Sequence, residues 1–253
     1  MNGVVTWHQG RCGSSVLGSL LNQHSRIQAA NEIFSKFMPR RRGAAPVPTM
    51  SAVLAAATET AKKPTLNIEV KYLSAQNFCL YQGSNTENWL HSADEHGFHR
   101  HVLIHRRNGL RRIVSHLMAQ RTGVYVQENN GLPTADRILT VDCSAIQEGV
   151  ETHDLIGWLE RYEKAHQRMQ QSLRTWCSAR ELPAPLELIF EESIEVSPHV
   201  AYRQMCAWLG EDDEQPTLRL QRINPEPLSA LISNWEEVQA LLRTTPHAWM
   251  LHG

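Results

Sequence analysis

The stretch "VVTWHQGRCGSSVLGSLLNQH" (residues 4–24) contains an apolar run, a Gly- and Ser-rich turn and a helical pattern in direct succession. The β-branched and aromatic residues at 4–7 predict a strand. Residues 10–13 predict a turn, and Ser14 can cap a helix, because apolar residues recur after it at helical spacing. Backbone N–H groups and the positive end of a helix dipole meet at such a junction. The stretch therefore predicts an anion-binding loop.

Apolar runs alternate with helical patterns along the rest of the chain. Strands are predicted at residues 4–7, 66–70, 101–104, 137–141 and 186–190. Helices are predicted at residues 14–23, 50–62, 86–96, 110–121, 152–176 and 228–242. Strands that alternate with helices imply a parallel sheet covered on both faces. We therefore expect an α/β fold with three layers, similar to that of P-loop proteins, in which helices flank a central parallel sheet. The predicted organisation is a single domain over residues 1–253 with irregular insertions.

Composition limits the class of protein. The chain has 253 residues, of which 42% are hydrophobic, enough for a large core. Its formal net charge is -1, so no overall basic field indicates a nucleic-acid partner. Apolar runs are too short for a transmembrane segment and the first strand leaves no room for a signal peptide, which predicts a cytoplasmic protein. Its five cysteines lack CxxC spacing, which argues against a disulfide framework and a zinc site.

The loop at residues 10–15 differs from the phosphate loop of NTPases. That loop requires Gly-Lys-Ser/Thr, because the lysine neutralises phosphates and the hydroxyl holds magnesium, and this chain lacks the tripeptide. Instead, Arg11 lies in the turn, and Ser14 and Ser15 begin the helix. A guanidinium, two hydroxyls and backbone donors suit an anion held without a metal. The alternative is an ordinary strand-to-helix turn with a solvated Arg11.

A second strand, turn and helix follow the same arrangement at residues 101–121. Asn108 is a suitable N-cap, and Ser115 lies about two helical turns beyond it on the same face. Arg107, between strand and cap, could therefore share an anion with Ser115. The alternative is an exposed cationic helix start formed by Arg106, Arg107, Arg111 and Arg112. The helix dipole disfavours that alternative unless an anion offsets the charges, so the ligand is expected to have two separate anionic groups.

Together these residues resemble the sulfotransferases that use 3′-phosphoadenosine 5′-phosphosulfate (PAPS). In that family a loop of the form Arg/Lys-x-Gly-Ser/Thr-Ser/Thr wraps the 5′-phosphosulfate, and an arginine and a serine eight residues later hold the 3′-phosphate. The matching residues here are Arg11, Cys12, Gly13, Ser14 and Ser15 for the loop, and Arg107 and Ser115 for the 3′-phosphate. Cys12 departs from the usual serine or threonine.

The resemblance is greatest to the carbohydrate branch, which includes nodulation-factor and trehalose sulfotransferases. "NQHSRIQAANEIF" (residues 22–34) stands where that branch has "HP…GE", with Ser25 in place of the proline. "RRNGLRRIVSHLMAQRTG" (residues 106–123) matches "RRN…S…A…TG". "RINPEPLSALISNWEEV" (residues 222–238) loosely matches a late "R…RPL…N" segment. The resemblance implies sulfuryl transfer from PAPS to a hydroxyl of a carbohydrate or lipid acceptor, with adenosine 3′,5′-bisphosphate (PAP) as the product.

The resemblance also implies roles for individual residues. Arg11 would neutralise charge on the leaving phosphate, and Ser14, Ser15 and backbone N–H groups near Gly13 would hold the other oxygens. Arg222 would close over the 3′-phosphate. Glu32 matches the glutamate of the carbohydrate branch and is the predicted general base. The alternative bases are His8 and His105, near strand ends.

Several features are left open. Lys71 matches a lysine of the carbohydrate branch and could touch the cofactor or the acceptor, or be solvated. Arg40–Arg42 could meet an acidic acceptor or a membrane surface, although an exposed loop is the usual reading of such a run. The apolar stripe of the long helix could pack on the sheet or on a second copy of the chain. The alternative functions are a metal-dependent kinase or NTPase and a non-catalytic nucleotide-binding module.

Overall fold

The computed structural model describes residues 1–38, 46–127 and 137–252. The chain forms two compact units, Met1–His105 with Ala165–Leu218, and Arg106–Lys164 with Arg219–Gly253. The single-domain organisation therefore stays a prediction. The basic run Arg40–Arg42 lies outside the described residues.

The first unit contains a five-stranded sheet in which every neighbouring pair is parallel. Its order is β2 (Ile27–Ala29), β3 (Thr65–Lys71), β1 (Asn2–His8), β4 (Arg100–His105) and β7 (Leu186–Ile189). The sequence of β1 suits its central position, because the side chains of a strand that is buried on both faces are apolar or form hydrogen bonds inside the protein. The predicted α/β fold with a central parallel sheet is confirmed.

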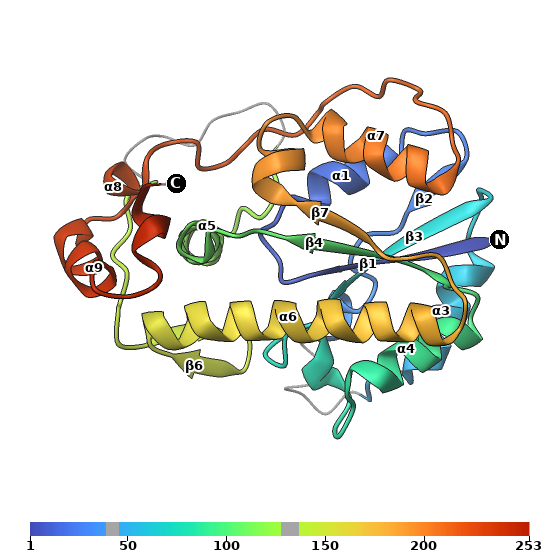
Figure 1. Cartoon of the computed structure of the whole chain (residues 1–253), viewed down its shortest axis with the longest axis horizontal. Helices are drawn as coiled ribbons and strands as arrows, with labels where there is room; N and C mark the ends of the chain where they lie inside the picture. Colours follow the sequence, from blue (N-terminus) through green and yellow to red (C-terminus); the bar gives the residue numbers. More distant parts are fainter. Residues whose placement is uncertain (39–45, 128–136, 253) are drawn as a thin grey trace. The chain divides into compact units, whose positions relative to one another are not determined.

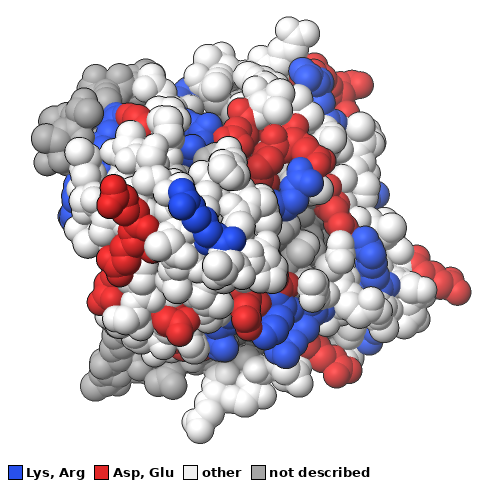
Figure 2. Space-filling model, turned by 60° about the vertical axis from the view of Figure 1, so that its left-hand side comes forward, with Lys and Arg blue, Asp and Glu red and all other residues white. Residues whose placement is uncertain are grey.

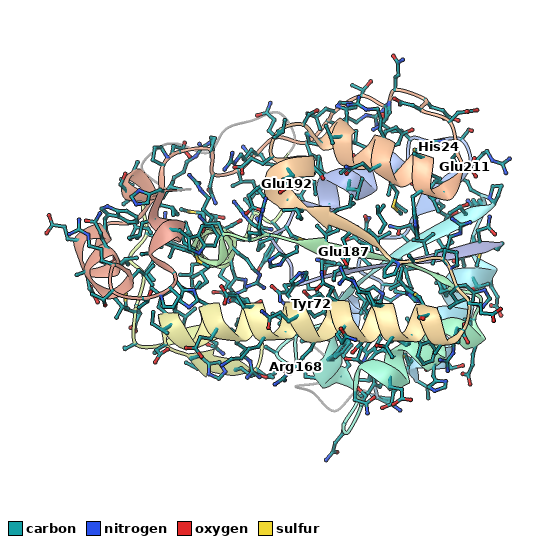
Figure 3. The ribbon with its side chains drawn as sticks, in the orientation of Figure 1. His24, Tyr72, Arg168, Glu187, Glu192 and Glu211 are labelled. Atoms are coloured by element: carbon teal, nitrogen blue, oxygen red, sulfur yellow. The ribbon has the colours of Figure 1, made fainter. Side chains whose placement is uncertain are left out.

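Helices cover both faces of this sheet (Figure 1). On one face, α1 (Ser14–Leu21) and α7 (Pro198–Leu209) pack with the apolar side chains of β1, β4 and β7. On the other face lie α3 (Met50–Glu59), α4 (Thr86–Glu95) and the second half of α6 (Leu155–Ala179). Glu187 of β7, labelled in Figure 3, fixes α6 to the sheet edge, because its carboxylate accepts hydrogen bonds from Gln170 and Arg174 at 2.7 Å each. The three layers are therefore held by two separate hydrophobic clusters.

β3 has apolar side chains on one face and polar side chains on the other. Leu66, Ile68 and Val70 pack in the cluster beneath α3, α4 and α6. Successive side chains of a strand alternate between faces, so Asn67, Glu69 and Lys71 point to the face covered by α1. Buried polar side chains therefore line the α1 face of β3.

The second unit contains α5 (Gly109–Thr122), the hairpin of β5 (Ile146–Glu148) and β6 (Glu151–His153), the first half of α6, α8 (Leu228–Leu231) and α9 (Trp235–Leu242). A Cβ added at Gly109 would lie 2.8 Å from Leu159 Cδ2, so α5 begins in direct contact with α6. The Asn108 side chain accepts the Arg111 N–H at 2.9 Å, which confirms the predicted cap.

The predicted strand at residues 137–141 is wrong. Within this fully described segment, Leu139 pairs with Ile232 in an isolated bridge. The Val141 N–H donates to Asn234 Oδ1 at 3.0 Å, so a side chain takes the place of a neighbouring strand. The same contacts interrupt the helix predicted at residues 228–242, which is divided into α8 and α9. Leu139 and Val141 are buried, but Ile138 between them in the run is 47% exposed.

Among the predicted boundaries that differ from those of the structure, two have a local cause. The long helix begins at Leu155 rather than at residue 152, because residues 151–153 form β6 and Asp154 Oδ1 accepts the Gly157 N–H at 2.6 Å. The last strand ends at Ile189, and Phe190 instead begins a single π-helical turn, η4 (Phe190–Ile194).

No helix in the described ranges combines the length and hydrophobicity needed to cross a bilayer. Figure 2 shows acidic and basic side chains interspersed on the visible face.

Candidate functional site

The loop after β1 has an unusual backbone. Gly10, Arg11 and Gly13 have φ values of 80°, 56° and 83°, all in the left-handed region. A turn with left-handed residues directs backbone N–H groups to one side, as in anion-binding nests. Gly13 is the N-cap of α1, so Ser14 is the first helical residue rather than the cap predicted from the sequence. The first turn of α1 has no acidic residue, and its dipole favours an anion at this end.

Gly13 also permits a close contact with the η4 turn. A Cβ at this position would lie 2.6 Å from Ile194 Cγ2 and 3.3 Å from Phe190 Cδ2. Both the positive φ and this contact exclude a larger residue. The π-helical turn after β7 therefore fixes the loop from one side.

The predicted loop residues have different surroundings. Arg11 is half-buried and Ser15 is exposed. Cys12 is 1% exposed and packs in the cluster beneath α1 and α7. Ser14 is buried, and its hydroxyl donates a hydrogen bond to the Glu69 carboxylate. The side chains of Cys12 and Ser14 thus face the protein interior, and an anion at the loop would meet their backbone N–H groups.

Glu32, the predicted base, lies in a polar contact beside this loop. Its Oε2 is 2.8 Å from Lys71 Nζ, at the end of β3, and it accepts the Ser35 hydroxyl at 2.5 Å. Burial is the largest single effect and would raise the pKa of Glu32, but the charges of Lys71 and His8 and the hydrogen bonds from Lys71 and Ser35 together hold the pKa below its usual value. Glu32 is therefore ionised at neutral pH, and Lys71 is an ion-pair partner rather than a solvated lysine.

Glu69 is a second carboxyl group next to Glu32. It is 1% exposed, and His8 Nε2 lies 3.4 Å from its Oε2. Burial raises the pKa of Glu69 to about 7, although the Ser14 hydrogen bond lowers it; the negative charge of Glu32 adds to the increase. Two neighbouring carboxyl groups thus have their pKa values moved in opposite directions, as is typical of acid–base sites.

One ligand atom from each of His8, Glu32 and Glu69 lies within 4.8 Å of the others, a spacing that would allow a metal ion. Two contacts argue against a metal ion here. The first is the ion pair with Lys71, whose positive charge already lies beside the Glu32 carboxylate. The Gly10 N–H donates to His8 Nδ1 at 3.1 Å, so the neutral ring has its proton on Nε2, the nitrogen a metal would need. Transfer without a metal stays a prediction.

The two histidines considered as alternative bases are in enclosed positions. His8 is 0% exposed and faces Glu69. The His105 ring is stacked on the His166 ring at 3.7 Å between centroids. Glu32 is more accessible than His8, with a side chain 25% exposed. The geometry thus favours Glu32 over His8 for contact with an acceptor.

The residues predicted for the second anionic group lie in the second unit, whereas the Arg11 loop lies in the first. Arg107 and Arg222 are exposed and Ser115 is half-buried. Arg112 is not part of an exposed cationic helix start, because it is 1% exposed and forms a two-pronged ion pair with Glu148.

Glu69 is absent from the residues predicted from the sequence. A signal for it exists, because Asn67, Glu69 and Lys71 alternate with apolar residues in a strand of a parallel sheet. Such strands are normally apolar on both faces. Alternating polar residues in one of them therefore indicate a buried polar cluster.

Among solved structures, the chain is similar to a sulfotransferase from Alicyclobacillus acidocaldarius, with a TM-score of 0.53. The sequences are 16% identical, and the match covers 100% of this chain and 94% of that protein. No protein-family model and no curated protein matches the chain. At this identity the likeness shows a shared fold.

Proposed function

We propose that this chain is a PAPS-dependent sulfotransferase that transfers the sulfuryl group to a hydroxyl of a carbohydrate or lipid acceptor. The observation on which the proposal mainly rests is the left-handed, arginine-containing loop after β1, together with the ionised Glu32 carboxylate, which pairs with Lys71 at the end of the neighbouring strand β3. The fold shared with a solved sulfotransferase supports it.

The position of the loop in the sheet also supports ligand binding. From β1 the chain continues to β2 and β3 on one side, and α4 then leads to β4 on the other side. Ligands of open parallel sheets bind at such a reversal, beyond the carboxyl ends of the strands. Arg11 follows the end of β1, and Lys71 is the last residue of β3, beside that end.

The two anion-binding segments take different parts of the nucleotide in this proposal. The loop from Arg11 to Ser15 binds the 5′-phosphosulfate, with backbone N–H groups and the Arg11 guanidinium as donors. Arg107, Ser115 and Arg222 bind the 3′-phosphate. Bidentate guanidinium contacts suit both groups.

PAPS supplies the sulfuryl group for an in-line displacement. Glu32 accepts the proton of the acceptor hydroxyl as the new S–O bond forms, and Arg11 neutralises the charge on the departing phosphate oxygen. Lys71 keeps Glu32 ionised before the reaction. Catalysis rests on positioning and on fixed charges.

The proposal is tested by binding and by transfer. PAP at about 100 times its Kd is expected to stabilise the folded protein by about 2.7 kcal/mol, measured as a rise in Tm. Labelled sulfate should pass from PAPS to a component of a carbohydrate and lipid extract, and Arg11→Ala should lower this transfer by about 100-fold or more. Arg203→Ala, an exposed arginine on α7, serves as the control. Absence of a shift with PAP, or nucleotide binding that depends on magnesium, would reject the assignment.

A further inference from the structure

Glu69 occupies the centre of a buried polar cluster that joins the anion loop to Glu32. Its carboxylate accepts the hydroxyl of Ser14, the first residue of α1. His8 Nε2, from β1, lies 3.4 Å away. A carboxylate oxygen of Glu32 lies within 4.8 Å of a carboxylate oxygen of Glu69. One side chain on β3 thus contacts or faces three segments that meet at the proposed site.

Helix α1 leaves room for this carboxyl group. A Cβ added at Gly18 would lie 3.0 Å from Glu69 Oε1 and 2.9 Å from Asn31 Oδ1. A glycine inside a helix lowers stability by roughly 1 kcal/mol relative to alanine. The absence of a side chain at Gly18 allows the Glu69 carboxyl group to approach the helix closely. This contact offsets the stability cost of the glycine.

We propose that Glu69 is a positioning residue of the sulfuryl-transfer site, which fixes Ser14 of the anion loop and adjusts the basicity of Glu32 by its charge. This inference rests on the proposed function for the identity of the reaction. Glu69 is too deeply buried to touch the acceptor, so it acts through its two neighbours.

The groups that face Glu69 determine how it titrates. His8 comes from β1, Glu32 follows β2, Lys71 comes from β3 and Ser14 comes from α1. Burial is the main reason that the pKa of Glu69 is about 7, and the charge of Glu32 adds to it. Above this pKa, Glu69 places a second negative charge beside Glu32. A nearby negative charge raises the proton affinity of a carboxylate, so Glu32 becomes a stronger base as Glu69 ionises.

The first test compares pH profiles of sulfate transfer for the wild type and Glu69→Gln. Glutamine retains the size of the side chain and an oxygen that accepts the Ser14 hydroxyl, but does not titrate. In the wild type, kcat should rise about 3- to 10-fold as the pH passes from about one unit below the pKa of Glu69 to about one unit above it. Glu69→Gln should lack this rise while PAP affinity stays within about twofold. A rise that persists in Glu69→Gln overturns the proposal.

A matched variant tests the contact with Ser14. Glu69→Ala removes the acceptor of the Ser14 hydroxyl, and PAP should then bind about 5- to 10-fold more weakly than to Glu69→Gln. Equal PAP affinity of the two variants would show that Glu69 does not fix the loop. Far-UV circular dichroism of both variants establishes that each is folded.

A second readout does not depend on activity. The carboxyl ¹³C signal of Glu32, assigned by its loss in Glu32→Gln, should show an inflection near the pKa of Glu69, and this inflection should be absent in Glu69→Gln. A protein that transfers sulfate without this inflection contradicts the inference alone. A protein that shows the inflection but neither binds PAP nor transfers sulfate contradicts the proposed function alone. An inflection abolished by EDTA would assign the cluster to a metal ion and overturn the inference.

Discussion

Glu32 combines partial exposure, an ion pair and a position next to the anion loop. Lys71, His8 and Ser35 together hold its pKa below the usual value against the larger single effect of burial, so the carboxylate is ionised and can accept a proton at neutral pH. Glu32→Gln is expected to lower kcat about 100- to 10,000-fold, with PAP affinity nearly unchanged. Steady-state kinetics and calorimetric titration with PAP measure the two effects.

The matched control for this change is Glu59→Gln, at the exposed end of α3. It should leave kcat unchanged. If Glu32→Gln retains full activity while the wild type transfers sulfate, another group is the base.

Lys71 determines the protonation state of Glu32, so its removal has a predictable direction. Without the ammonium group 2.8 Å away, burial raises the pKa of Glu32. The acidic limb of the kcat/KM profile reports the ionisation of an essential base in the free enzyme. For Lys71→Met this limb should therefore move to higher pH.

Lys62→Met changes an exposed lysine that precedes β3 and should leave the acidic limb in place. An unchanged limb in Lys71→Met would mean that the ion pair does not set the ionisation of the base.

A buried ion pair helps to join α5, β5 and α6 in the second unit. Arg112 forms hydrogen bonds of 2.9 and 2.7 Å to Glu148, whose Oε2 also accepts the Tyr162 hydroxyl at 2.6 Å. Arg112→Met leaves the Glu148 charge buried without its partner and is expected to lower the free energy of unfolding by about 3–5 kcal/mol. The double change Arg112→Met, Glu148→Leu should recover most of this loss. Urea denaturation measures both.

The same ion pair predicts that the stability of the fold decreases in acid. Burial would raise the pKa of Glu148, but the charge and hydrogen bonds of Arg112 lower it to about 2. A depressed pKa stabilises the fold above the ordinary glutamate pKa of 4.5, and this contribution is lost as the pH falls towards 2. The double variant should therefore lose less stability in this range. Lys164→Met, in an exposed pair on α6, should cost less than about 1 kcal/mol at neutral pH.

Elements with strong local signals were predictable from the sequence. The strands β1, β3, β4 and β7 are apolar runs bounded by turns, and the five helices predicted before residue 180 have clear periodicity. β2 has three residues and is defined by its pairing with β3, which no local pattern shows. The segment at residues 137–141 has the same composition as a strand. Leu139, however, forms an isolated backbone bridge with Ile232, and the backbone of Val141 forms hydrogen bonds with the side chain of Asn234. Local composition indicates burial there, and tertiary pairing decides the structure.

The candidate site was predictable to a similar degree. The Arg11 loop and the Asn108 cap follow from local sequence patterns, whereas Glu32 was singled out by the resemblance to the carbohydrate branch. The Glu69 cluster was not predicted, because it depends on parallel register, which places residues from β1, β2 and β3 at one end of the sheet. Register is set by the fold as a whole.

The proposed function makes a prediction at the scale of the whole chain, because the two predicted anion-binding segments belong to different compact units. In the proposed function, the Arg11 loop binds the phosphate group at the 5′ position of the nucleotide, and the segment that begins at Arg107 binds the one at the 3′ position. Ligand binding protects amides from hydrogen exchange where it suppresses local opening.

PAP is therefore expected to slow amide exchange in two regions together, the Arg11 loop with the first turn of α1, and the segment from Arg107 into α5. Hydrogen-exchange mass spectrometry at saturating PAP measures both.

In Arg107→Ala, PAP affinity should fall about 10- to 100-fold, since a charged hydrogen bond is worth about 1.5–3 kcal/mol. Arg243→Ala, an exposed arginine after α9, is the control and should retain wild-type affinity. Protection restricted to the Arg11 loop, together with an Arg107→Ala variant that binds PAP normally, would show that the second segment has no part in nucleotide binding. The assignment of Ser115 and Arg222 to the 3′-phosphate would then be rejected, because the proposed function has all three residues bind the same phosphate group.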